Sequence, residues 1–185
     1  MSIRSWINLR NSRGAALVEF AFILPILLLL FLGTFEATRV VRTMMKVSNA
    51  AQAYANLIAS PMAAALSTSD LTNNCNGAKL VLTPFDGTVF SAAVASLSSG
   101  DGATWTQVWH DTTHCGAGVG SISGTSLASG ITPTSTGDVV IVVKAQYSYT
   151  SPVTFVLPGS QTLSSTAFSR PRSNTTVTCA SCTAN

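Results

Sequence analysis

The sequence predicts an α+β protein in which a single-pass N-terminal membrane helix continues into a long amphipathic helix packed on a small antiparallel β-sheet. Three observations support this fold class. A 21-residue apolar run carries a single ionisable side chain, apolar residues then recur every three or four positions, and later segments alternate in polarity. Of the 185 residues only 9% are charged, against about 25% in ordinary soluble domains.

The charges lie mainly beside the apolar run. Residues 1–46 contain six Lys and Arg against two Glu, whereas residues 47–185 contain four Lys and Arg against five Asp. Most of the chain therefore has no basic patch, and we expect no nucleic-acid partner. The low charge and the high apolar content are also untypical of a disordered chain.

The apolar run, AALVEFAFILPILLLLFLGTF over residues 15–35, is long enough to cross a membrane. At about 1.5 Å per residue it spans about 30 Å, the thickness of the hydrocarbon core. Three Arg residues and no acid precede it, whereas behind it Glu36 partly offsets Arg39, Arg42 and Lys46. The small remaining difference favours a cytoplasmic N-terminus. The alternative is a cleaved secretory signal, but the small-x-small sequence Ala51-Gln52-Ala53 lies far beyond the run. Pro25, in the middle of the run, is expected to kink the helix.

The ionisable residue of the run is Glu19. A carboxylate inside a membrane helix costs about 2.5–3.5 kcal/mol on insertion scales, so it needs a partner or access to water. Glu19 lies near the start of the run, so it can reach water at the headgroups or pair with a cation inside the membrane. The surrounding sequence favours the second interpretation: Arg13-Gly14-Ala15-Ala16-Leu17-Val18-Glu19-Phe20.

A short basic leader that ends in Gly, followed by Glu five residues later in an apolar helix, resembles a type IV prepilin cleavage site. More narrowly, residues 14–39, GAALVEFAFILPILLLLFLGTFEATR, resemble the TadE-like pseudopilins of Tad (tight adherence, Flp) pilus systems. The positions that carry the resemblance are Val18-Glu19-Phe20-Ala21, Leu24-Pro25, the Leu run, Gly33 and Glu36. Phe20 stands where major Flp pilins usually have Tyr, which favours a minor pseudopilin.

The resemblance implies a pilin-like fold and a non-enzymatic role in pilus assembly, with no cofactor. Prepilin peptidase would cut between Gly14 and Ala15 on the cytoplasmic side, where a residue without a Cβ suits an extended substrate. Glu19, next to Phe20, would then pair with the new α-amino group of Ala15 on a neighbouring subunit. The implied partners are the prepilin peptidase, other pilin and pseudopilin subunits, the inner-membrane assembly platform and the lipid bilayer.

We divide the chain into a cytoplasmic leader (1–14), a transmembrane helix (15–35), a helix continuation (36–60) and a periplasmic α+β domain (61–185). The helix is expected to continue to about Ala59, because Pro61 is the first residue that stops it. The apolar stripe of this continuation comprises Val40, Val41, Met44, Val47, Ala51, Tyr54, Leu57 and Ile58.

Elements of the outer domain follow from shorter patterns. Residues 67–83 carry a weak helical stripe, and residues 88–97 and 104–111 alternate as strands around the turn Ser99-Gly100-Asp101-Gly102. Trp105 and Trp109 are expected on one face of the second of these strands. Residues 116–137 are predicted to form a long loop. Residues 138–150 form the strongest strand, with one end expected to be buried on both faces, and residues 162–170 form the expected last strand.

Four cysteines, Cys75, Cys115, Cys179 and Cys182, follow the apolar run. In an oxidising periplasm we expect disulfides. Four cysteines allow three pairings; we favour Cys75–Cys115 and Cys179–Cys182, although the sequence leaves the connectivity open.

The competing hypothesis is a membrane-anchored periplasmic metal-binding or hydrolytic domain, in which His110, His114 and the cysteines hold zinc. The sequence has only one Cys-x-x-Cys, and it has no Gly-x-Ser-x-Gly elbow or phosphate-binding Gly loop. We therefore predict neither a metal site nor an active site.

Overall fold

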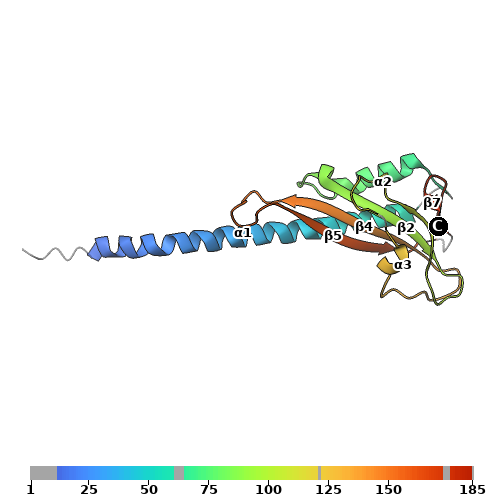
Figure 1. Ribbon diagram of the computed structural model, residues 1–185, viewed down its shortest axis with the longest axis horizontal. Coiled ribbons are helices and arrows are strands. Elements are labelled where there is room, and N and C mark those ends of the chain that lie inside the picture. The colour runs from blue at the N-terminus through green and yellow to red at the C-terminus, as the bar shows by residue number, and fades with distance from the viewer. Residues whose placement is uncertain (1–11, 61–64, 121, 173–175, 185) are drawn as a thin grey trace, which may run out of the picture.

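The computed structural model describes residues 12–60, 65–120, 122–172 and 176–184. Figure 1 shows a long N-terminal helix with a β-sheet domain along its C-terminal half. Residues 1–11 of the predicted leader, and Pro61, lie outside the described residues. The elements in chain order are α1 (Ser12–Ala59), β1 (Ala65–Leu66), α2 (Thr68–Leu80), the 3-10 turn η1 (Gly87–Val89), β2 (Phe90–Ser98), β3 (Thr106–Asp111), α3 (Gly124–Leu127), β4 (Val139–Thr150), β5 (Ser160–Ser169), β6 (Thr178–Cys179) and β7 (Thr183–Ala184).

The continuation of α1 packs on the sheet and ends at Ala59, as the sequence predicts. Its buried face holds Glu36, Thr43, Val47, Ala50, Ala51, Tyr54, Ala55, Ile58 and Ala59. Part of the predicted apolar stripe is wrong, because Val41, Met44 and Leu57 are 52%, 52% and 41% exposed. The buried face instead includes two polar residues whose side chains find partners inside the protein, so hydropathy alone placed the stripe incorrectly.

The central sheet has the strand order β5-β4-β2-β3-β7 and is antiparallel throughout. In its middle, Phe90 lies opposite Tyr147 and Ser98 opposite Val139. A separate parallel pair joins β1 to β6. The strand predicted over residues 162–170 is confirmed as β5, but it is not the last one, since β6 and β7 follow it. These are two-residue strands, too short to show any alternation in the sequence.

The sheet lies between two layers. On one face, α1 and α2 share a core with Ile141, Val143 and Ala145 of β4. On the other face, Val140 and Val142 pack with residues of β2 and of the loop that carries α3. The first half of β4 is therefore buried on both faces, as predicted, and its long run of β-branched residues suits that position.

The two tryptophans of the β3 region lie on opposite faces of the sheet, which corrects the expectation that they share one. Trp109 is buried in the core beside α1, whereas Trp105 packs in the cluster on the far face. The pairing of β2 with β3 shifts register between Ser96 and Leu97, which leaves Val108 as an extra residue in β3. An inserted residue of this kind reverses the side to which the preceding residues point.

Two disulfides are present, with the pairing that we favour from the sequence. Cys75 of α2 is bonded to Cys115, just after β3, across a sequence separation of 40 residues. Cys179 is bonded to Cys182 across a separation of 3. Helix α2 begins with a capping box, in which Ser67 Oγ accepts from the Asp70 N–H and the Asp70 carboxylate accepts from the Ser67 N–H. The cap fixes the start of the helix that presents Cys75 to the core.

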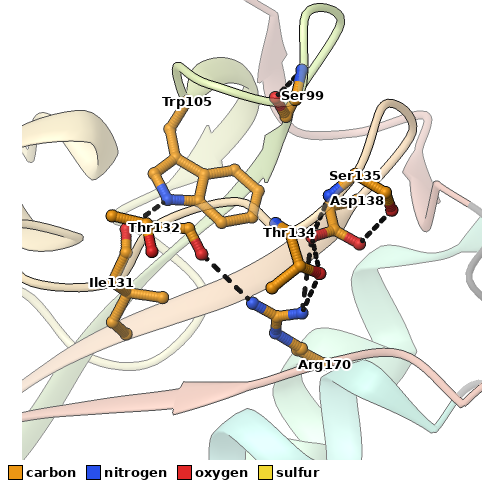
Figure 2. A network of polar contacts seen from close by, with 9 residues as sticks. Ser99, Trp105, Ile131, Thr132, Thr134, Ser135, Asp138 and Arg170 are labelled. Carbon is orange, nitrogen blue, oxygen red and sulfur yellow. Dashed lines mark hydrogen bonds and ion pairs between the residues drawn. The ribbon is translucent and has the colours of Figure 1, made fainter.

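A polar network closes the end of the sheet where β4 begins (Figure 2). The Asp138 carboxylate, 5% exposed, accepts from the backbone N–H and the hydroxyl of both Thr134 and Ser135. Arg170, at the end of β5, reaches Asp138 Oδ2 at 3.4 Å and the Thr132 carbonyl at 3.5 Å. Trp105 Nε1 donates to the Ile131 carbonyl at 2.7 Å. These bonds fasten the end of the 116–137 loop to the sheet.

The network predicts a specific loss of stability in acid. Hydrogen bonds from Thr134, above all, lower the pKa of Asp138 from its ordinary 3.8 to about 2. Because the pKa of Asp138 is lower in the folded state than in the unfolded chain, its carboxylate stabilises the fold at pH values above its ordinary pKa. This stabilisation is lost as the pH falls towards about 2, where the folded state takes up the proton. We expect Asp138→Asn to lower the Tm at pH 7 and to make the decline in Tm between pH 4 and pH 2 shallower.

The measurement is thermal unfolding of the full chain in detergent, followed by circular dichroism across that pH range. Asp86→Asn is the comparison: a hydrogen bond from the Thr88 N–H also lowers the pKa of Asp86, but this carboxyl is exposed and caps only η1, so its substitution should change the acid decline less than Asp138→Asn does. Unchanged acid sensitivity in Asp138→Asn would contradict this assignment.

Candidate functional site

The N-terminal half of α1 is a bare apolar helix. In the described part of the chain, one helix, Gly14–Ala59, is long and apolar enough to cross a membrane; an 18-residue window in it has mean hydropathy 2.7 and is 0% buried. Figure 1 shows this half extending beyond the sheet domain. A contiguous apolar surface of this kind marks contact with lipid or with other chains. Its large side chains are 39–76% exposed: Leu17, Val18, Phe20, Phe22, Ile23, Leu24, Ile26, Leu27, Leu28, Leu29, Leu30 and Phe31.

The predicted cleavage site lies in the first turn of α1. The helix begins at Ser12, so Gly14 and Ala15 have helical backbone rather than an extended one. A Cβ built on Gly14 would meet nothing within 4 Å. A protease that binds an extended substrate must therefore unwind the helix around Gly14 and Ala15.

Glu19 lies on the bare part of the helix, next to Phe20, which is 55% exposed. Within the part of the chain that the structure describes, no hydrogen bond or ion pair reaches the Glu19 carboxylate. A charge at this position in a membrane therefore requires a partner outside the described chain, or access to water.

Two threonine hydroxyls farther along α1 are satisfied within the helix. The Thr34 hydroxyl donates to the Leu30 carbonyl and the Thr38 hydroxyl to the Thr34 carbonyl, each at 2.8 Å. Such bonds let a hydroxyl lie against an apolar environment without an unpaired donor. The helix is continuous through Pro25, and the kink expected there stays a prediction.

The sequence reading missed the contact that joins α1 to the sheet. Glu36 is only 2% exposed, and its Oε1 accepts a hydrogen bond from the Tyr149 hydroxyl of β4 at 2.5 Å. Burial of the Tyr149 side chain is the larger cause, and the nearby Glu36 carboxylate the smaller one, that raise the pKa of Tyr149 to about 12. The phenol therefore stays a hydrogen-bond donor at neutral pH. The available signal was the spacing of Glu36, which lies four residues before Val40, the first residue of the predicted apolar stripe.

The residues of the zinc hypothesis do not come together. His114 Nδ1 lies 2.7 Å from Asp111 Oδ1, whereas His110 Nδ1 contacts the Gln107 amide at 3.1 Å. All four cysteine sulfurs form disulfides, so none is available as a thiolate ligand. Among the described residues there is no group of three His, Cys, Asp or Glu that could hold a metal ion. This arrangement does not favour the metal-binding alternative.

An exposed apolar helix that continues into an α+β domain defines a pilin-like arrangement and is consistent with a single-pass membrane anchor. Residues 14–55 match a family model described as TadE-like protein. The match covers the bare half of α1 and most of its continuation, and it confirms the resemblance found in the sequence. The TadE-like segment indicates a component associated with the Tad pilus. Neither the curated proteins nor the solved structures contain a match.

Proposed function

We propose that this protein is a minor pseudopilin, a non-enzymatic structural and assembly component of a Tad-type pilus. The observation that carries the proposal is the bare apolar half of α1, which lies within the TadE-like match and holds Glu19 near its start. In this proposal the chain resides in the bacterial inner membrane before assembly. The leader is cytoplasmic, residues 15–35 span the bilayer, and the domain of residues 61–185 lies in the periplasm.

The mechanism is assembly through helix packing. Prepilin peptidase cuts between Gly14 and Ala15, which creates an α-amino group at the start of the apolar helix. The Glu19 carboxylate of a neighbouring subunit pairs with this amine, so each charge compensates the other in the apolar bundle. The pairing also sets the stagger between neighbouring helices. Other pilin and pseudopilin subunits and the inner-membrane assembly platform supply the remaining contacts.

The periplasmic location of the domain is supported by its two disulfides. Disulfides persist in oxidising compartments and are rare in a reducing cytosol. With the domain in the periplasm, Arg4, Arg10 and Arg13 lie on the cytoplasmic side, but Arg39, Arg42 and Lys46 follow the span on the periplasmic side. The positive-inside rule therefore adds little to this orientation, which rests on the disulfides.

The test of this proposal is the N-terminus of the mature protein. We expect mass spectrometry of the chain from cells that contain the cognate prepilin peptidase to find Ala15 as the first residue, and the complete chain from cells that lack it. Gly14→Val should block cleavage, because a branched side chain at the cut site prevents the close approach of the backbone to the protease; Gly33→Val is the matched control outside it. A mature protein that begins at Met1 or near Ala53 contradicts the proposal.

A further inference from the structure

The loop between β4 and β5 carries the most exposed large apolar side chain of the described residues. Residues 151–159, SPVTFVLPG, contain no charged residue. Phe155 is 81% exposed, more than any large apolar side chain on the bare part of α1 that the structure describes. An aromatic ring is a large apolar surface that normally finds a covered position. The exposed ring therefore indicates a contact with lipid or with another chain.

Phe155 lies in a turn that is held by backbone and side-chain hydrogen bonds. The Val153 carbonyl accepts from the N–H groups of Val156 and Leu157 at 3.0 and 3.2 Å. The Ser151 hydroxyl accepts from the Val153 N–H at 2.9 Å. These bonds close one helical turn around Phe155 and hold it at the tip of the loop.

The loop lies beside the end of the apolar run of α1. Figure 1 shows the connection between β4 and β5 as the part of the sheet domain nearest the N-terminal end of α1. The Tyr149–Glu36 hydrogen bond fixes the base of the hairpin at this level. Farther out, the loop and α1 line a common groove formed by Gly33, Glu36, Ala37, Val40, Val41, Val156, Leu157, Gln161 and Leu163. Since residues 15–35 form the apolar run, the loop is level with its end.

We infer that Phe155 and the turn that carries it contact the periplasmic surface of the lipid bilayer, with the ring at the boundary between headgroups and acyl chains. The inference rests on the proposed function, because it requires residues 15–35 to span the membrane. The headgroup region is only about 5–7 Å thick on each side, and aromatic rings concentrate there. The turn keeps its own carbonyls at headgroup level, where water can still reach them.

Lipid fits this surface better than a second copy of the chain does. The turn has no charge that would have to leave water, and it adjoins the surface that already faces the hydrocarbon. Arg39 and Arg42 follow the end of the apolar run on α1, where long basic side chains reach lipid phosphates. The loop thus gives the domain a second membrane contact, which sets its tilt before the subunit is extracted.

Depth-dependent fluorescence quenching tests the inference on the full chain in vesicles of phosphatidylcholine and phosphatidylglycerol. An environment-sensitive fluorophore is attached to one introduced cysteine while both native disulfides stay oxidised, and spin-labelled phosphatidylcholine is the quencher. The label is placed at Thr154→Cys beside the ring, at Leu27→Cys within the span, or at Ala103→Cys in the β2–β3 turn at the opposite end of the sheet. Phe155→Ser and Phe155→Leu are then combined with Thr154→Cys.

We expect the Thr154 label to be quenched by shallow spin labels several-fold more than the Ala103 label. Phe155→Ser should lower the equilibrium constant for loop insertion about tenfold, as the loss of a buried aromatic side chain does, whereas Phe155→Leu should retain most of it. Quenching at Leu27 with none at Thr154 overturns the inference and leaves the membrane anchor intact. Absence of quenching at Leu27 overturns the anchor and the inference together. A Thr154 label that is shielded only at high protein density identifies a second copy as the occupant and also overturns the inference.

Discussion

Replacing Glu19 with alanine should abolish pilus assembly while leaving leader cleavage and membrane insertion intact. The carboxylate lies on the bare part of α1 without a partner among the described residues, and in the proposed bundle it meets the α-amino group of Ala15. Removing one partner of a buried ion pair costs about 3–5 kcal/mol, because the other charge stays buried and unpaired. A loss of that size weakens the subunit contact more than about a hundredfold.

The measurement compares the sheared surface fraction with the membrane fraction of the same cells, together with the mass of the mature chain. Glu19→Gln separates charge from shape and should fail like Glu19→Ala. Phe20→Leu, which changes an exposed apolar neighbour, is the matched control and should assemble. Normal piliation by Glu19→Ala would rule out the pairing of Glu19 with an amine.

The second large effect is expected from the Cys75–Cys115 disulfide. Both cysteines are buried, and the bond closes a loop with a separation of 40 residues between α2 and the end of β3. Cross-linking a loop of this length restricts the unfolded chain by about 4 kcal/mol in the chain-entropy account. The double substitution Cys75→Ala and Cys115→Ala should therefore lower the Tm of the domain by on the order of 10 °C or more.

Thermal unfolding of the full chain in detergent, followed by circular dichroism, measures this effect. The control is the double substitution Cys179→Ala and Cys182→Ala, because a separation of only 3 residues restricts the unfolded chain far less. Reductant added to the native protein should reproduce the larger of the two effects. Equal losses from the two pairs would show that loop length does not govern their contribution.

The long elements were predictable because their patterns repeat many times. The apolar spacing over residues 36–60 and the absence of Gly and Pro from them indicate an end near Ala59, where the helix does end. The twelve-residue strand β4 shows the alternation of a strand and the apolar run of a doubly buried one. The strands β6 and β7 have two residues each, so no period can be read from them.

The candidate assembly residues could be predicted from the sequence for a different reason. Gly14, Ala15, Glu19 and Phe20 lie within one short segment, and the roles proposed for them depend on the order of neighbouring residues. The contact between Glu36 and Tyr149 joins positions 113 residues apart. Polar side chains are normally assigned to a solvated surface, so this pair emerges only when α1 and β4 are packed together.

The sequence by itself determined the α+β class, the membrane-length apolar helix, its continuation to Ala59 and the segment that carries the processing and pairing hypotheses. These features depend on local composition and short periods, which one stretch of chain contains in full. Only the tertiary structure decided which side of α1 is buried, which face each tryptophan occupies, how the cysteines pair and where Phe155 lies. Each of these depends on the register of the sheet and on contacts between distant residues, because a single extra residue such as Val108 reverses the faces of a strand.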